Sequence, residues 1–119
     1  MIRPRNDLER VYVYRHPVDM RKATNGLVVL VESVLCLDPF SSQLFVFHNR
    51  RRDIVKMVWW ERNGFCLWTK RLEKERFKWP LHLEGDVIAL NGQQLNWVLD
   101  GYDLSVMRPH RALRYSSVL

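Results

Sequence analysis

Two apolar runs separated by a short polar turn constrain the fold of this chain more than any other feature. Residues 54–60 (IVKMVWW) and 65–72 (FCLWTKRL) are rich in β-branched and aromatic side chains, which is typical of strands. Between them stands the sequence ERNG, residues 61–64. Asn-Gly is the strongest short hairpin signal, because both residues accept the positive φ angles of a type I′ turn. We therefore predict an antiparallel hairpin that turns at Asn63-Gly64.

This turn also sets the pairing of the two strands. Trp60 is then expected to face Leu67, and Lys56 to face Arg71, and opposed side chains share one face of the ribbon. The face predicted to enter the core carries Val55, Met57, Trp59, Trp68 and Leu72. The other face carries Lys56, Val58, Trp60, Leu67, Thr69 and Arg71. On this second face we expect an exposed indole, that of Trp60, beside two like charges.

Further strands are predicted on either side of a helix. Residues 10–15 (RVYVYR) alternate in the manner of a short strand, and residues 44–47 (LFVF) form an apolar run typical of a buried strand. In residues 24–37 the apolar positions recur at helical spacing, with Thr24 as a candidate N-cap and Asp38-Pro39 as a stop. The many valines of this segment also suit a strand.

A second helix is predicted near the C-terminus and completes the fold. Asn91 and Gln94 have the spacing of a capping box, and Gly101 supplies a C-terminal stop. The predicted fold class is α+β, a single small domain in which an antiparallel β-meander of about four strands packs with two helices. We expect one domain over residues 1–119, with flexible ends at 1–9 and 104–119.

Composition is that of an ordinary globular protein, with a hydrophobic fraction of 47%. The chain has two cysteines, Cys36 and Cys66, each inside an apolar run, which predicts buried reduced thiols in a reducing compartment. The start of the sequence, MIRPRNDLER, lacks the apolar core of a signal peptide, and no apolar run approaches the ~20 residues of a membrane span. We expect a cytoplasmic protein that does not enter a membrane.

The net charge of +6 is concentrated in the middle third of the chain. Residues 50–78 hold ten basic and four acidic side chains, which accounts for the whole excess, whereas the two types balance elsewhere. Clustered Lys and Arg favour a polyanionic partner, because they displace counterions from phosphates. The candidate DNA-binding residues are Arg50, Arg51, Arg52, Lys56, Trp60, Lys70, Arg71, Lys74, Arg76 and Lys78. The alternatives are a solvated charged face with Trp60 packed under a helix, and an exposed charged connector over residues 70–80.

Patterns that indicate catalysis are scarce. The four histidines lie far apart, and neither they nor the two cysteines have metal-ligand spacing. No glycine-rich phosphate loop or nucleophile elbow occurs. We predict a non-enzymatic protein without catalytic residues, metal or cofactor. A metal-dependent nuclease remains an alternative, with carboxylates drawn from Asp19, Asp38, Asp53, Asp100 and Asp103.

Between Asp19 and Asp103 the chain resembles the small TnpB-type, or Orf2-like, accessory proteins of the IS66 group of bacterial insertion sequences. The resemblance rests on DMRK (19–22), GLVVLV (26–31), DPF (38–40), LFVF (44–47), the arginines 50–52, KMVWW (56–60) and GFCLWTKRLEKERFKWP (64–80). Residues 1–15 and the tail after Asp103 depart from the family pattern. The resemblance implies a bacterial protein needed for transposition together with a separate, larger DDE-type transposase.

Two functions follow as hypotheses. The first is a non-enzymatic accessory factor that binds DNA, either transposon ends or DNA in general, through the basic centre, and acts with the transposase and other proteins of the element. The second is a protein-interaction module that binds the transposase without touching DNA, anchored by Trp60, Phe77 and Trp79, since tryptophan beside arginine is typical of interface hot spots.

Overall fold

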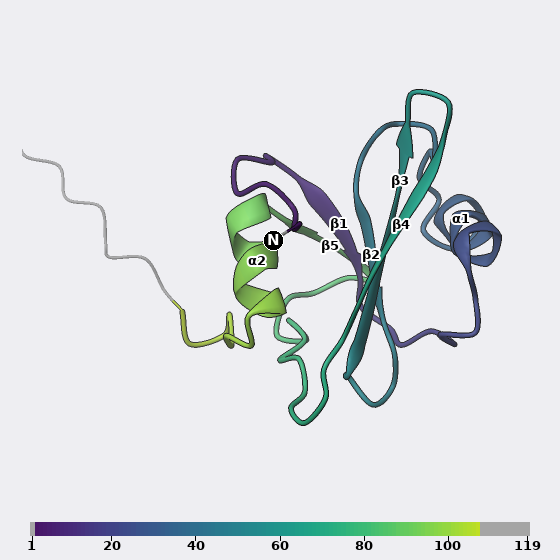
Figure 1. The fold of residues 1–119 in the computed structure, drawn as a ribbon. Coiled ribbons are helices and arrows are strands. Elements are labelled where there is room, and N and C mark those ends of the chain that lie inside the picture. Colours follow the sequence, from purple (N-terminus) through teal and green to yellow (C-terminus); the bar gives the residue numbers. More distant parts are fainter. Residues whose placement is uncertain (1, 108–119) are drawn as a thin grey trace, which may run out of the picture.

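The computed structural model describes residues 2–107, which form a five-stranded sheet with two helices (Figure 1). The elements are β1 (Val11–Tyr14), α1 (Thr24–Ser33), β2 (Phe45–His48), β3 (Ile54–Glu61), β4 (Gly64–Arg71), β5 (Val87–Leu90) and α2 (Gly92–Leu99). The predicted α+β class is confirmed. Each predicted strand and helix is present, with bounds that differ by a few residues. The predicted end at 104–119 lies largely outside the described residues.

The strand order β4-β3-β2-β1-β5 corrects the predicted topology in two respects. The meander β2-β3-β4 is antiparallel as predicted, but β1 pairs with β2 in parallel. Parallel neighbours need a crossover connection, and the segment containing α1 supplies it. A fifth strand, β5, pairs antiparallel with β1 and was missed, because its apolar run VIAL is short and directly precedes the α2 capping pattern.

The two helices cover opposite faces of the sheet (Figure 1). Side chains that alternate along each strand therefore enter two separate cores. Val11, Val46 and Met57 belong to the core on the α2 face, which also contains Leu95 and Leu99 of α2. The α1 face contains Leu27 and Val31 of α1 together with Phe45, Phe47 and Val58. Both faces of the central strands are thus buried.

The β3–β4 hairpin forms as predicted, but its register differs. Glu61 pairs with Gly64 and Trp60 with Phe65, so the loop residues are Arg62-Asn63, and Arg62 rather than Gly64 has a positive φ, of 55°. Each partner on β4 moves by two positions, which leaves every side chain on its predicted face. Lys56 now faces Thr69 instead of Arg71, so the expected opposition of like charges does not arise. The observed register also packs Trp60 edge-to-face on Phe65, with ring centroids 5.0 Å apart.

The ends of the helices test the predicted capping residues. Thr24 is not the cap of α1, since the N-cap is Ala23 and no side chain bonds there. This helix ends at Ser33, well before Asp38-Pro39, and Cys36 then adopts a φ of 56°. In α2 the predicted capping box is confirmed: the Asn91 side chain accepts from the Gln94 N–H, and the Gln94 side chain accepts from the Asn91 N–H. Gly101 follows with a φ of 94°.

We expect Gly92→Ala to lower the free energy of unfolding by about 1–3 kcal/mol, a cost typical of overpacking. A Cβ atom at Gly92 would collide with the backbone oxygen of Arg5, so the N-terminal segment must move away from α2. Gly64→Ala is the matched control, because a Cβ atom there meets nothing within 4 Å. Urea unfolding of both variants checks this prediction, and equal stability of the two would contradict it.

Candidate nucleic-acid interface

The side chain of Asn49 builds the turn that carries the three consecutive arginines. Its amide donates to Asp53 Oδ1 at 2.6 Å, and its oxygen accepts from the backbone N–H groups of Asp53 and Ile54, both at 3.1 Å. Arg52 closes the turn with an N–H bond to the Asn49 carbonyl and a φ of 59°. The Asn49 hydrogen bond, followed by the nearby Arg51 and Arg71, lowers the pKa of Asp53. Arg50 and Arg51 are exposed on this hydrogen-bonded turn.

The segment after β4 lies against this turn. The Leu72 N–H donates to the Asp53 carbonyl at 2.8 Å, and the Phe77 N–H donates to the Arg52 carbonyl at 2.7 Å. Phe77 and Trp79 are buried, and the Trp79 ring stacks on His48 with centroids 4.1 Å apart. These contacts hold residues 72–80 in place although they form no regular element, and they leave the intervening charged side chains exposed.

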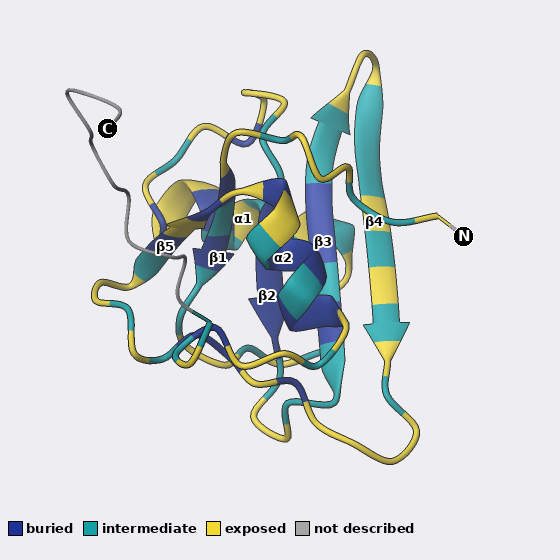
Figure 2. Cartoon of the chain, turned by 90° about the vertical axis from the view of Figure 1, so that its left-hand side faces the viewer, coloured by how far each residue is buried: buried dark blue, intermediate teal, exposed yellow. Residues whose placement is uncertain are grey.

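The arginine turn and this segment together form one end of the molecule, at the bottom of Figures 1 and 2. We call this surface the basic end; its cations are Arg50, Arg51, Arg52, Arg71, Lys74, Arg76 and Lys78. Within these two segments the acids are Asp53, Glu73 and Glu75, so cations exceed acids by seven to three. Two acids from elsewhere in the chain also lie near this surface, Asp19 beside Arg50 and Asp103 close to Lys78. The ion pairs found within residues 2–107 include none of these seven cations. Their charges are therefore available to an external anion.

Lys56 and Lys70 do not belong to the basic end. The Lys56 ammonium donates to the backbone oxygens of Met20 and Lys22, at 2.8 and 3.1 Å, on the α1 face. The Lys70 ammonium donates to the Leu99 carbonyl at 2.9 Å, on the α2 face. Leu99 is the last residue of α2, and the C-terminus of a helix stabilises a nearby cation. The structure therefore separates these two candidate residues from the other cations, because the side chains of Lys56 and Lys70 lie on opposite faces of the sheet and bind the backbone.

Trp60 is also separated from the basic end. It lies near the hairpin, whereas the arginine turn precedes Ile54, and six residues of strand span about 20 Å. Its indole is partly buried between Phe40 and Phe65, with centroids 5.1 and 5.0 Å away. The predicted uncovered indole beside the cations is therefore wrong.

The predicted burial of both cysteines is wrong as well, since Cys36 is exposed and Cys66 is partly buried; both are free.

The carboxylates proposed for a nuclease are engaged locally and apart from one another. Asp19 binds Arg21, which lowers the pKa of Asp19 to about 2, and Asp100 binds Arg3 in a bidentate pair. Asp103 accepts from Ser105, and Asp38 from the Phe40 N–H. Across residues 2–107 no three His, Cys, Asp or Glu side chains come together to hold a metal ion.

In the same range no helix has the length and apolar character needed to cross a membrane.

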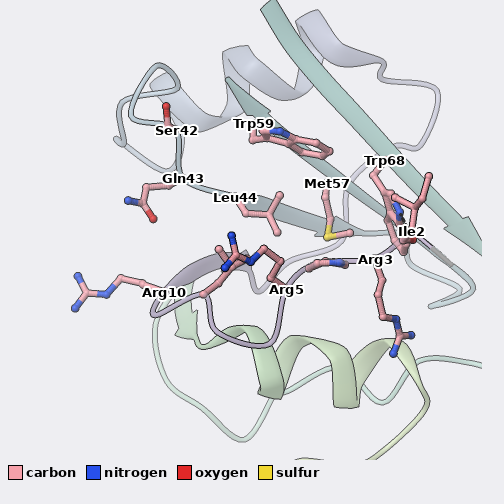
Figure 3. Close-up of a pocket in the computed structure, with 12 residues that line it drawn as sticks. Ile2, Arg3, Arg5, Arg10, Ser42, Gln43, Leu44, Met57, Trp59 and Trp68 are labelled. Atoms are coloured by element: carbon pink, nitrogen blue, oxygen red, sulfur yellow. Dashed lines mark hydrogen bonds between the residues drawn. The ribbon is translucent and has the colours of Figure 1, made fainter. Parts of the chain in front are cut away.

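A pocket of about 290 Å³ lies between the N-terminal segment and the α2 face of the sheet (Figure 3). Met57, Trp59 and Trp68 of β3 and β4 line it, and Trp68 Nε1 donates to the backbone oxygen of Ile2. Of the arginines at its margin, Arg3 is paired with Asp100 and Arg5 with Asp7. The pocket is apolar and its margin is largely neutralised, so it does not extend the basic end.

Comparison with known proteins places the chain in a family. Residues 9–109 match the model of the family described as IS66 Orf2 like protein. The chain is 40% identical over 94 residues to the uncharacterized protein y4hO of Sinorhizobium fredii, covering 79% of this chain and 81% of that protein. It is 38% identical over 103 residues to the uncharacterized protein y4jC of the same organism, covering 82% and 87%. No solved structure matches it significantly.

The chain belongs to the IS66 Orf2-like family. It is thus an accessory protein of insertion-sequence transposition, in a family that is generally not catalytic. The resemblance inferred from residues 19–103 is confirmed.

His48 and Asn49 directly precede the arginine turn and support the basic end. Neither residue was predicted from the sequence to be functional. His48 is buried in β2, and its Nδ1 atom has no hydrogen-bond partner within the described structure. Burial, together with the positive charge of Arg52 and the proximity of His16, lowers the pKa of His48 to about 4. The sequence offers one signal for this pair, a polar His-Asn dipeptide between an apolar strand and three arginines.

We expect acid to destabilise the protein through His48. The folded-state pKa of about 4 lies below the ordinary 6.5, so the unfolded chain binds the proton more readily, and stability falls as pH drops from 6.5 to 4. The loss is up to about 3 kcal/mol. His48→Phe keeps the stacking on Trp79 and cannot titrate, so this component should disappear. Urea unfolding of both proteins at pH steps between about 7 and 4 measures it; parallel pH profiles would contradict the assignment.

Proposed function

We propose that this accessory protein binds DNA through the phosphate backbone, using the seven cations of the basic end. The observation that carries the proposal is that these cations enter none of the ion pairs found within residues 2–107. Two backbone hydrogen bonds, from Leu72 to Asp53 and from Phe77 to Arg52, bring together the two chain segments that carry them. Lys and Arg on such a surface gain affinity by releasing counterions from DNA. Lys56 and Lys70, whose ammonium groups bind backbone carbonyls, are not part of this surface.

The contact we propose is independent of base sequence. The seven cations lie on a turn, a strand end and an irregular segment, and none lies on a helix that could enter the major groove. Trp60 takes no part in it, since its ring packs on phenylalanines at the other end of β3. The arrangement supports positioning on the DNA backbone rather than the reading of bases.

We further propose that the chain acts with the transposase of its element, which would supply the cutting and joining chemistry. The separate possibility of a transposase-binding module anchored by Trp60, Phe77 and Trp79 loses two of its anchors, because Phe77 and Trp79 are buried in the core. Among the residues that we described for it, only Trp60 retains partial exposure.

We expect the quadruple change Arg50→Gln, Arg51→Gln, Lys74→Gln and Arg76→Gln to weaken DNA binding and flatten its salt dependence. Each phosphate contact contributes about 0.9 to the slope of log K against log salt, so loss of these cations should reduce the slope by about 2 to 4. All four side chains are exposed, which spares the fold. Fluorescence anisotropy with a labelled duplex over a salt series measures the slope.

The matched control changes four exposed cations elsewhere, Arg5, Arg10, Arg21 and Lys22, to Gln. It removes the same net charge but leaves the basic end intact, so the slope should stay within about one unit of the wild-type value. If both quadruple variants lose affinity and slope equally, binding depends on net charge and not on this surface. If neither changes, DNA does not bind at the basic end.

A further inference from the structure

Strand β4 presents a long edge without a neighbour in the sheet of the described chain. Its first six residues, GFCLWT (64–69), carry no charge and are rich in β-forming side chains. Proteins usually protect an exposed edge with charges, proline, a bulge or a short strand. The opposite edge, β5, is only four residues long. An uncharged edge of this length on β4 is suited to pairing with another strand.

The hydrogen-bonding phase of β4 shows which backbone groups face outward. The Leu72 N–H donates to the Asp53 carbonyl, which makes that pair a hydrogen-bonded one in the antiparallel ladder. Such pairs recur at every second residue, so the N–H and C=O groups of Phe65, Leu67 and Thr69 point away from β3. These three residues therefore offer a continuous row of free donors and acceptors.

Apolar side chains flank this row on both faces. Leu67 is 37% exposed at the edge itself, and Phe40, 55% exposed, lies against the ring of Phe65 at 5.3 Å on the α1 face. On the α2 face Trp68 Nε1 binds the carbonyl of Ile2, whose side chain is 86% exposed. Figure 2 shows the N-terminal segment crossing β4 and ending beyond its free edge. A strand added to β4 would cover apolar surface on both sides.

We propose that the occupant is a second copy of this chain, with the two β4 strands antiparallel across a two-fold axis near Leu67. Antiparallel pairing of identical strands makes both patches equivalent, as a closed dimer requires. It also separates the like charges of Lys70 and Arg71 in the two copies, which parallel pairing would bring together. Leu67 then meets its own counterpart, and the N-terminal segment of each copy lies over the strand of the other.

The proposed dimer, taken together with the proposed function on which this step rests, fixes the spacing of two basic ends. Arg71 lies four residues from Leu67, about 13 Å along the strand, so the two basic ends would stand about 26 Å or more apart at opposite ends of the ribbon. That separation is comparable with the roughly 34 Å helical turn of DNA. The dimer would present two phosphate-binding surfaces to one duplex, and avidity would follow from the linkage.

The test is the molar mass of the full-length protein in solution without DNA, measured by light scattering after size-exclusion chromatography. We expect the wild type to have twice the 14.3 kDa mass of the chain. Leu67→Lys should halve it by placing like charges at the axis. Thr69→Pro should halve it by removing an outward N–H, which costs no bond to β3. The control is Val106→Lys at a position that is 75% exposed and follows α2, and it should remain dimeric.

A cross-link provides a second measurement that does not depend on dissociation. With Cys36→Ser and Cys66→Ser in the background, Leu67→Cys should oxidise to a covalent dimer, because facing residues of a hydrogen-bonded pair lie about 5.5 Å apart between Cα atoms, within disulfide range. Val106→Cys in the same background should not. A monomeric wild type, or a dimer that survives both β4 changes with normal circular dichroism, overturns the proposal. Neither result decides whether the basic end binds DNA, which the salt series tests separately.

Discussion

Burial of both faces of the sheet is the constraint on which the rest of this structure depends. With α1 on one face and α2 on the other, the central strands bury side chains on both faces. Lys56 of β3 and Lys70 of the edge strand β4 are partly buried under these layers, and their ammonium groups donate to backbone carbonyls, which compensates for lost hydration. The cations of the basic end lie at or beyond the ends of β2, β3 and β4, and they enter none of the ion pairs found within residues 2–107.

The same constraint separates two surfaces with different chemistry. At the basic end, two backbone hydrogen bonds join segments that are distant in the chain: Leu72 to Asp53, 19 residues apart, and Phe77 to Arg52, 25 residues apart. Over residues 64–69 the side chains of the edge strand β4 carry no charge, and the outward donors and acceptors belong to the backbone. The first surface suits a polyanion and the second suits another strand, so the proposed DNA contact and the proposed self-association would use different residues.

Much of the fold was predictable from local patterns, since a hairpin, a capping box and an apolar alternation each act over a few residues. The hairpin over 54–72, the α2 cap at Asn91 and the two faces of β3 and β4 are confirmed. The predicted register was wrong. Asn63-Gly64 favours a turn with these two residues in the loop, whereas the observed loop is Arg62-Asn63 and its register packs Trp60 on Phe65. The parallel pairing of β1 with β2 and the strand β5 depend on contacts between distant segments, which no local pattern reports.

The candidate site was likewise predictable only in part. By itself the sequence determined that the chain is basic in its middle third, that the hairpin strands carry large aromatic residues, and that it resembles the IS66 Orf2-like family. Only the tertiary structure decided which cations remain free, that Phe77 and Trp79 belong to the core, and that Trp60 stands at the far end of β3. Charge and hydrophobicity are properties of residues, but exposure and pairing depend on what other parts of the chain pack against them.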